Sequence, residues 1–235
     1  MRPPASFEVI NATINRELLE SVSASGILLD AGCGRGKNIR SLEGSSLRFR
    51  TIVGIDIHFP DVQSSKNQVS DTVRLLNGNA LSLPFANETF DCVLSNQVIE
   101  HIPAYVEYLD ELRRVLRSGG YLVVSTPNFH CPRNTFLKMI RKEPMLRWPN
   151  LQNLPPEQFR GHTQEFTEKE LIDLVCSRQF RLVRNRPLQP QATFRGNLLY
   201  NAYSVGEHLF AAASRPFVAR GYSKNNNMLF QRDDG

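Results

Sequence analysis

Short apolar runs alternate with amphipathic stretches over the first 130 residues of the chain. Compact runs rich in Leu, Ile and Val predict buried strands at residues 27–29, 51–56, 73–76, 90–96 and 121–125. Apolar residues that recur every three to four positions predict helices at 7–24 and 103–117, the second ended by Gly119 and Gly120, and a short helix is expected at 37–42. This pattern predicts a doubly wound α/β fold with a mostly parallel sheet.

The pattern changes after residue 128. Residues 129–163 contain five prolines and the one Trp of the chain, which predicts a substrate-side insertion or lid between the fifth strand and the next helix. Thr167 and Glu170 fit a capping box that opens a helix through Val175. Further expected elements are a sixth strand at 180–184, a helical stripe at 199–213 and a last edge strand at 228–231. We expect a single domain over residues 1–235.

The stretch Leu28–Lys37 links the first strand to the first following helix and carries glycines at 32, 34 and 36. Glycine lets the backbone turn sharply and approach a ligand closely. A strand, a glycine turn and a helix together open many nucleotide-binding sites. The spacing differs from the G-x-G-x-x-G fingerprint of dinucleotide sites, and Asp30 closes the strand. These features favour a nucleotide-derived ligand other than a dinucleotide.

Asp56 ends the second predicted strand. A carboxylate at this place can accept hydrogen bonds from both hydroxyl groups of a ribose. The alternative is an ordinary loop acid. Ser95, Asn96 and Gln97 end the fourth strand and therefore belong to the same carboxyl edge of the sheet, where ligands of open α/β folds bind.

The D-x-G-x-G-x-G stretch at Asp30–Gly36 resembles the first motif of the class I S-adenosylmethionine-dependent methyltransferases. Three further segments resemble this family in the same order: Asn77–Phe85, Leu112–Gly120 and the His-x-x-Glu-Phe-Thr segment that starts at His162. The chain departs from the family pattern at Asn79, where the family has an aspartate. The resemblance implies a seven-stranded, Rossmann-like sheet and S-adenosyl-L-methionine as the cofactor.

The resemblance also implies the residues that contact the cofactor. The methionyl part is expected at Asp30 and the glycines, the ribose at Asp56, the adenine at Asn79 and Ala80, and the sulfonium side at Asn96. The complete expected set is Asp30, Gly32, Cys33, Gly34, Gly36, Asp56, Ile57, Asn79, Ala80 and Asn96.

Methyl transfer from a sulfonium needs little acid–base machinery, because the cofactor carries the leaving group and the protein mainly positions the acceptor. An oxygen or nitrogen acceptor can still require a base, and histidine is suited to that near neutral pH. His101 and His162 are the catalytic candidates. The alternatives are a pocket wall for His101 and a helix-capping role for the segment of His162 and Glu165. The sequence contains no recognisable metal-ligand spacing, so no metal is expected.

The net charge of +5 is distributed unevenly. Residues 131–235 carry 16 Lys and Arg against 9 Asp and Glu, which indicates either an anionic partner, such as a substrate or a membrane surface, or a solvated basic face. Nucleic acid is disfavoured, because basic and aromatic residues do not interleave and Ser95–Val98 does not match the N/D-P-P-[FY] motif of base methyltransferases.

The chain has no stretch of about 20 apolar residues and no apolar signal core in Met1–Glu8, which predicts a cytoplasmic protein without a transmembrane segment. Peripheral membrane contact, and the choice between monomer and homodimer, stay open. The four cysteines are far apart and are expected to be free thiols.

These observations predict an enzyme that transfers a methyl group from S-adenosylmethionine to an oxygen or nitrogen of a small-molecule, glycan or lipid-linked acceptor, which is anionic if the basic region contacts it. Two alternatives remain. One is a non-catalytic S-adenosylmethionine-binding partner subunit, and the other is an NAD(P)-dependent oxidoreductase, which the glycine spacing disfavours.

Overall fold

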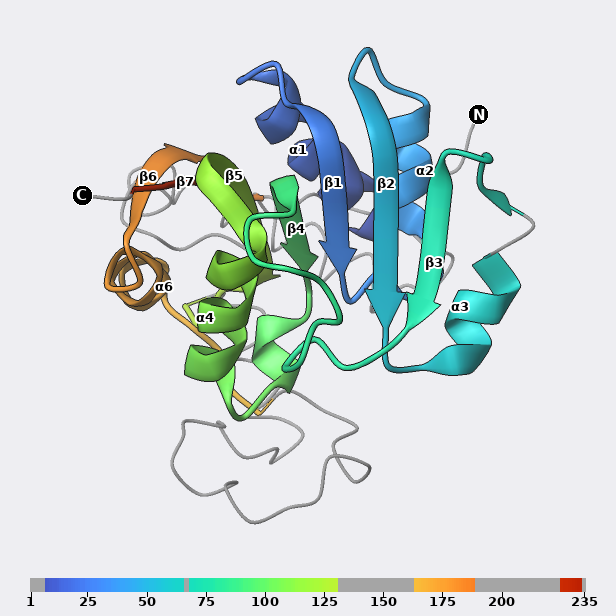
Figure 1. The fold of residues 1–235 in the computed structure, drawn as a ribbon. Coiled ribbons are helices and arrows are strands. Elements are labelled where there is room, and N and C mark those ends of the chain that lie inside the picture. Colours follow the sequence, from blue (N-terminus) through green and yellow to red (C-terminus); the bar gives the residue numbers. More distant parts are fainter. Residues whose placement is uncertain (1–6, 66–67, 131–162, 189–224, 234–235) are drawn as a thin grey trace, which may run out of the picture.

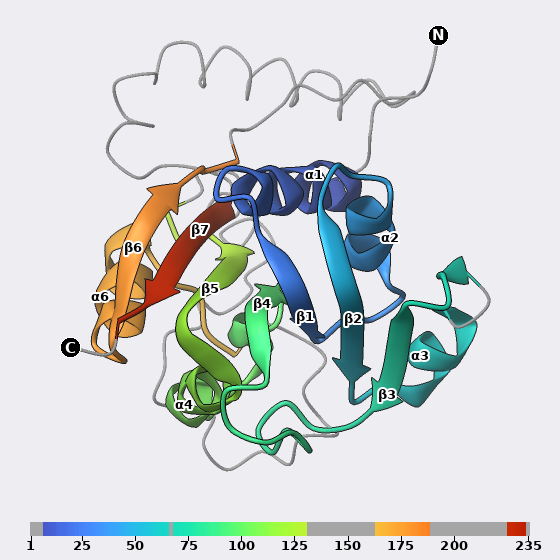
Figure 2. The ribbon, with the colours of Figure 1, turned by 45° about the horizontal axis from the view of Figure 1, so that its top comes forward.

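Helices pack on both faces of a central sheet in the computed structural model, which describes residues 7–65, 68–130, 163–188 and 225–233 (Figure 1; Figure 2). In chain order the elements are α1 (Phe7–Glu20), β1 (Ser25–Ala31), α2 (Lys37–Glu43), β2 (Arg48–Asp56), α3 (Phe59–Ser65), β3 (Val73–Asn77), β4 (Phe90–Asn96), the 3-10 helix η2 (Ile99–His101), α4 (Tyr105–Val115), β5 (Leu116–Pro127), α6 (Glu168–Cys176), β6 (Phe180–Asn185) and β7 (Asn225–Arg232).

The seven strands lie in the order β3-β2-β1-β4-β5-β7-β6. Strands β1 to β5 pair in parallel, whereas β7 runs antiparallel to both β5 and β6. The strand order reverses between β1 and β4, and ligands of open α/β sheets bind outside the carboxyl ends of the strands at such a point. The predicted doubly wound, mostly parallel, seven-stranded fold is confirmed.

A hydrophobic core lies on each face of the sheet. Leu28 and Leu29 are adjacent in β1 and both are fully buried, because successive side chains of a strand point to opposite faces. Leu28 belongs to the core that includes Leu18 of α1, whereas Leu29 belongs to the core with Leu109 of α4 and Leu171 of α6. Burial on both faces explains why this strand reads as a continuous apolar run.

The helix predicted at 103–117 is shorter than expected, and its predicted end is wrong. α4 ends at Val115, and β5 already begins at Leu116, so Gly119 and Gly120 lie inside the strand. The β4–β5 register shifts there, between Phe90 and Cys92, and Gly119 takes up this irregularity with a φ of 70°. The glycines therefore belong to a bulge and not to a helix stop. The first helix is also shorter than predicted, because α1 ends at Glu20.

The last strand was predicted at the edge of the sheet, and this prediction is wrong. β7 extends from Asn225 to Arg232 and lies between β5 and β6, which leaves β6 at the edge. The first three residues are asparagines and read as polar in sequence, yet each of them is fully buried. Hydrogen bonds between their side chains and other buried groups make this burial tolerable.

The two ends of the predicted insertion at 129–163 meet at the carboxyl edge of the sheet. Asn128 and Phe166 form a parallel bridge, and the Phe129 amide donates to the Phe166 carbonyl at 3.0 Å. Most of the insertion, and the stripe predicted at 199–213, lie outside the described residues. Within the described ranges, no helix has the length and apolar character that crossing a membrane requires.

Candidate cofactor site

The glycine turn after β1 has a backbone that side chains would disfavour. Gly32, Gly34 and Gly36 have φ angles of 83°, 47° and 69°. A Cβ added to Gly32 would lie 2.3 Å from Cγ2 of Val98, so this position also lacks room for a side chain. The amides of Gly32 and Cys33 both donate to the Ile55 carbonyl, at 2.8 and 3.0 Å, which ties the turn to β2. The Cys33 side chain is buried beneath the turn.

Asp56 holds the glycine turn from the end of β2. Its Oδ2 accepts from the Gly34 amide and its Oδ1 accepts from the His58 amide, both at 2.8 Å. The carboxylate therefore has a structural role besides the ribose contact predicted for it. Each oxygen keeps acceptor capacity, because an ionised carboxylate offers about four lone-pair sites. Ile57 follows with its side chain 67% exposed, which leaves an apolar surface beside Asp56.

Asp30, at the end of β1, is a buried carboxyl group. Neither of its side-chain oxygens has a hydrogen-bond partner among the described residues. Burial, followed by the nearby charge of Asp56, raises the pKa of Asp30 from 3.8 to about 7, and the Asn38 amide opposes this rise. An unpartnered buried carboxylate is costly alone and fits a cationic group of a ligand.

Asn96 is placed at the carboxyl end of β4 by two amide contacts. Its Oδ1 accepts from Nδ2 of Asn11 in α1 at 2.6 Å, and its Nδ2 donates to Oδ1 of Asn38 in α2 at 3.2 Å. The structure thus brings Asp30, Asp56, Asn96 and the glycine turn to one edge of the sheet, as predicted. The sequence analysis missed Asn11 and Asn38. A usable signal was the four-residue spacing of Asn11 and Asn15, which places both on one face of α1.

Comparisons with known proteins show the family of the chain. The profile of the family described as "Methyltransferase domain" matches residues 29–124, which contain the glycine turn, Asp56 and Asn96. The ubiquinone biosynthesis O-methyltransferase of Cereibacter sphaeroides is 30% identical over 172 residues, which cover 72% of this chain and 66% of that protein. The chain belongs to the class I S-adenosylmethionine-dependent methyltransferases.

Two further matches agree with this family. A protein of Mycolicibacterium smegmatis named as an S-adenosylmethionine-dependent methyltransferase is 34% identical over 155 residues, with 66% of this chain and 52% of that protein covered. The chain spans just under two thirds of the length of the ubiquinone biosynthesis O-methyltransferases that it matches. A solved S-adenosylmethionine-dependent methyltransferase from Mesorhizobium loti shares the fold, with a TM-score of 0.64 at 12% identity over 95% of this chain and 100% of that chain.

The loop that carries the predicted adenine contacts is anchored by α4. Arg114 donates to the carbonyls of Leu83 and Phe85, at 3.0 and 2.8 Å, and Glu111 accepts from the Leu83 amide at 2.7 Å. The Arg114 guanidinium, which pairs with Glu111, holds the pKa of that carboxyl below its ordinary value. These two anchoring residues were not singled out from the sequence.

Asn79 and Ala80 lie on this same loop. Asn79 is exposed, and its Oδ1 accepts from the Leu81 amide at 2.9 Å, so the side chain shapes a local turn. Ala80 is partly buried against the core. The adenine contact remains a prediction for both residues.

The two catalytic candidates differ in what the structure says of them. His101 is exposed at the end of η2, close to the carboxyl end of β4, whereas His162 lies outside the described residues. The neighbouring Glu100 is fully buried and accepts from Thr126 Oγ1 at 2.9 Å. Its carbonyl also accepts from the Thr163 amide at 2.7 Å. Glu100 thus connects η2 to β5 and to the end of the insertion, and His101 stands next to this anchor.

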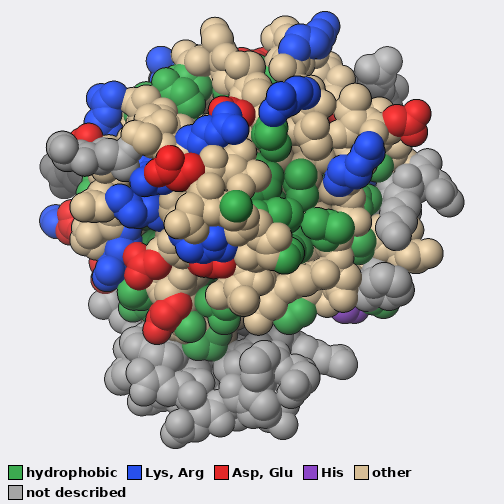
Figure 3. Space-filling model, in the orientation of Figure 1, with side chains coloured by type: hydrophobic (Ala, Val, Ile, Leu, Met, Phe, Trp, Pro, Cys, Tyr) green, Lys and Arg blue, Asp and Glu red, His purple; other side chains and the backbone are tan. Residues whose placement is uncertain are grey.

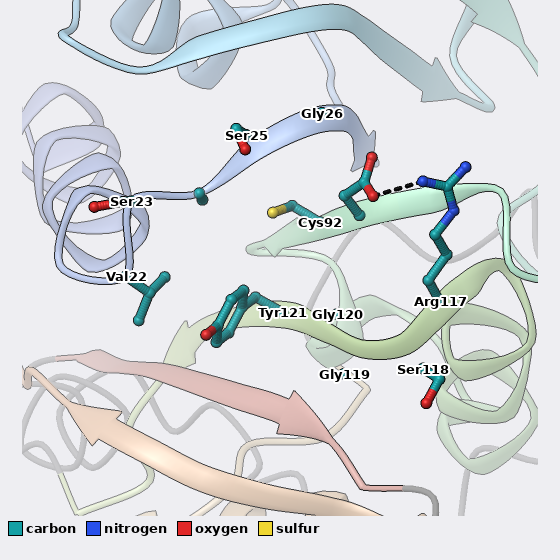
Figure 4. Close-up of a pocket in the computed structure, with 12 residues that line it drawn as sticks. Val22, Ser23, Ser25, Gly26, Cys92, Arg117, Ser118, Gly119, Gly120 and Tyr121 are labelled. Carbon is teal, nitrogen blue, oxygen red and sulfur yellow. Dashed lines mark hydrogen bonds and ion pairs between the residues drawn. The ribbon is translucent and has the colours of Figure 1, made fainter.

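A pocket of about 250 Å³ lies at the opposite, amino edge of the sheet, between the starts of β1 and β4 and the bulge of β5 (Figure 4). Its charged groups are engaged in structural contacts. Asp91 accepts from Arg117 at 2.6 Å and from the Ile27 amide at 2.7 Å, and Arg117 also donates to the Glu88 carbonyl. None of the residues that line the pocket belongs to the glycine turn. The pocket lies beside the irregular start of β5 and is separate from the cofactor site.

Basic side chains around α4 and β5 are interleaved with acids on the face shown in Figure 3. Arg117 pairs with Asp91, and Arg232 pairs with Glu88 at 2.9 Å. Most of residues 131–235, which carry the positive excess, lie outside the described ranges.

Among the described residues, no group of three or more His, Cys, Asp or Glu side chains is arranged to hold a metal ion.

Proposed function

We propose that this methyltransferase transfers a methyl group from S-adenosylmethionine to an oxygen atom of a small-molecule acceptor. The observation that carries the proposal is the left-handed glycine turn, which Asp56 holds beside the unpartnered, buried carboxyl of Asp30. S-adenosylmethionine supplies an activated methyl group and bears both an ammonium and a sulfonium cation. A buried carboxylate is a suitable counter-charge for such a ligand.

The roles follow the order of the strands. Asp30, Gly32, Cys33, Gly34 and Gly36 hold the methionyl part, Asp56 and Ile57 the ribose, Asn79 and Ala80 the adenine, and Asn96 the sulfonium side. The bare backbone of Gly34 allows close approach of the ligand, since the nearest heavy atom to a Cβ there would be Asp56 Oδ2 at 4.0 Å. The exposed side chain of Ile57 offers apolar surface to the flat part of the nucleoside.

The acceptor enters over η2, where both ends of the 129–163 insertion meet the sheet. His101 stands at this position and removes the acceptor proton, and His162 is the second candidate for that role. An oxygen acceptor is favoured because the named relative of Cereibacter sphaeroides is an O-methyltransferase of ubiquinone biosynthesis. The acceptor is then a quinol-like or other lipid-soluble hydroxy compound, and the cytoplasmic location and an anionic acceptor group belong to the same proposal.

Calorimetric titration with S-adenosylhomocysteine tests the cofactor assignment. Asp56→Ala removes the acceptor that holds the Gly34 amide and should weaken binding by about tenfold or more. Asp71→Ala is the matched control, because Asp71 is an exposed acid that precedes β3 at the amino edge, and its affinity should equal that of the wild type. Equal affinity of Asp56→Ala and the wild type would contradict the assignment.

The acceptor is tested with labelled S-adenosylmethionine and three probes: a quinol with a free hydroxyl group, a primary amine and an anionic glycan. We expect label in the quinol. Transfer to the amine alone would contradict an oxygen acceptor. Binding of the cofactor without transfer to any probe would favour the non-catalytic alternative.

A further inference from the structure

Three asparagines form a chain of amide contacts from α1 into the cofactor site. Asn11 Nδ2 donates to Asn96 Oδ1 at 2.6 Å, and Asn96 Nδ2 donates to Asn38 Oδ1 at 3.2 Å. Asn11 and Asn38 are only 1% and 5% exposed. These hydrogen bonds connect α1, the end of β4 and α2, and the last member, Asn38, influences the pKa of Asp30.

The donor-to-acceptor direction of these hydrogen bonds is fixed at Asn11. Asn11 Oδ1 accepts from Asn227 Nδ2 at 2.6 Å and from Asn225 Nδ2 at 3.2 Å, both in β7, and also from Ser125 Oγ at 3.1 Å. A carboxamide carries its acceptor on one arm and its donors on the other. With its oxygen held by β5 and β7, Asn11 can present only its NH2 group to Asn96.

The same rule fixes the orientation of the Asn96 and Asn38 amides. Asn96 accepts on its oxygen and must donate from its nitrogen, so Asn38 accepts on its oxygen and keeps its own NH2 group for another neighbour. The Asn38 side chain opposes the rise that burial and Asp56 cause in the pKa of Asp30, although neither Asp30 oxygen accepts a hydrogen bond of ordinary geometry. The other titratable groups that sense the Asp30 charge are Cys33 in the glycine turn and Tyr108 of α4.

We propose that Asn11 is a positioning residue of the cofactor site: it fixes the amide of Asn96 and, through Asn96, the orientation of Asn38, so that the ligand meets a preformed site. This inference rests on the function proposed above and assigns to α1 a part in cofactor binding. A role confined to packing would concern stability alone.

Asn15 provides the matched control, one helical turn further along α1. It is equally buried, at 1% exposed, and its Oδ1 accepts from Asn227 Nδ2 at 3.0 Å. Its contact with β7 resembles that of Asn11, but Asn15 takes no part in the contacts to Asn96 and Asn38. Replacing Asn15 therefore disturbs the packing of α1 on β7 but leaves the hydrogen bonds from Asn11 to Asn96 and from Asn96 to Asn38 in place.

The test compares the affinity of Asn11→Leu, Asn38→Leu, Asn15→Leu and the wild type for S-adenosylhomocysteine, titrated calorimetrically between about pH 6 and pH 9. A cationic ligand favours ionised Asp30, so wild-type affinity should rise with pH through the pKa of that group. Asn11→Leu and Asn38→Leu should bind about tenfold more weakly near neutral pH. Their pH midpoint should also move upward, since the Asn38 side chain lowers the pKa of Asp30. Asn15→Leu should match the wild type in both respects.

Unchanged affinity and midpoint in Asn11→Leu, with normal binding by the wild type, would overturn this inference and leave the proposed function intact. Absence of wild-type binding at every pH would overturn the proposed function itself. If Asn11→Leu does not fold, Asn11→Ser serves in its place, because its hydroxyl can still accept near β7 while the smaller side chain lacks the NH2 group that Asn11 donates to Asn96. The affinity and the pH midpoint of Asn11→Ser then test the inference in the same way.

Discussion

The Asp30 carboxyl combines complete burial with a pKa raised to about 7, and this has a consequence for stability. Between the unfolded value of 3.8 and about 7, the folded protein holds a proton that the unfolded chain has lost. The free energy of unfolding is therefore highest, as far as Asp30 is concerned, below the unfolded pKa of 3.8. It falls by about 1.4 kcal/mol per pH unit as the pH rises to the folded pKa of about 7, and the contribution is lost above that pH. Asp30 therefore destabilises the ligand-free protein at neutral and higher pH.

Asp30→Asn should remove this penalty. Relative to the wild type, the variant should gain stability on going from about pH 5 to about pH 8, by on the order of 2–3 kcal/mol, and should bind S-adenosylhomocysteine at least about tenfold more weakly. Urea unfolding at both pH values, with a calorimetric titration, measures the two effects. A stability difference between variant and wild type that does not change with pH would contradict the burial argument.

Two glycines of the turn should respond differently to alanine. Gly32→Ala places a Cβ 2.3 Å from Val98 at a φ of 83°, so it should lower the free energy of unfolding by about 2–3 kcal/mol. Gly34→Ala meets only Asp56 Oδ2 at 4.0 Å, so it should cost about 1 kcal/mol in stability but obstruct the ligand. Denaturant unfolding and S-adenosylhomocysteine titration separate the two. Equal losses of stability would show that the turn is not built as described.

At the scale of single elements, α6 shows that a local sequence motif can predict where a helix begins. Its start was predicted from Thr167 and Glu170, and the structure contains the complete capping box, with Thr167 Oγ1 accepting from the Glu170 amide at 3.1 Å and Glu170 Oε2 accepting from the Thr167 amide at 2.9 Å. Such signals act within one helical turn, so the sequence is sufficient to find them. The box directly follows Phe166, which bridges to Asn128 at the carboxyl edge of the sheet.

Thr167→Ala should therefore destabilise the protein by about 1 kcal/mol, which for a chain of this size lowers the melting temperature by roughly 2–4 °C. Ser177→Ala is the control at the other end of α6, where the exposed hydroxyl donates to the Leu174 carbonyl. Differential scanning calorimetry compares the two variants. A melting temperature of Thr167→Ala equal to that of the control would show that α6 does not depend on its cap.

Other elements could not be read from local pattern. α4 has strong apolar periodicity, which extends in sequence into β5, and the boundary at Leu116 is set by pairing with Phe90 of β4. β7 was truncated in the prediction because its first three residues are asparagines. Their burial depends on partners such as Asn11, which precedes Asn227 by 216 positions in the chain.

At the scale of the whole molecule, the sequence predicted the fold and one edge of the site. Asp30, Asp56 and Asn96 each lie at the end of a recognisable strand, and parallel strands bring their carboxyl ends together. Asn11 and Asn38 gave no comparable signal, because their role arises from contacts between α1, β4 and α2 that only the folded sheet creates. The anchoring of the Leu83–Phe85 loop by Arg114 belongs to the same class of long-range contact.

The central claim is that the glycine turn binds S-adenosylmethionine, and thermal unfolding of the intact protein tests it most directly. The protein is heated with S-adenosylhomocysteine, with NADH and without ligand. A ligand at about 100 times its dissociation constant adds about 2.7 kcal/mol, which should raise the midpoint by roughly 5–10 °C for a chain of this size. We expect this rise with S-adenosylhomocysteine alone. A rise with NADH, or none with S-adenosylhomocysteine, would contradict the account.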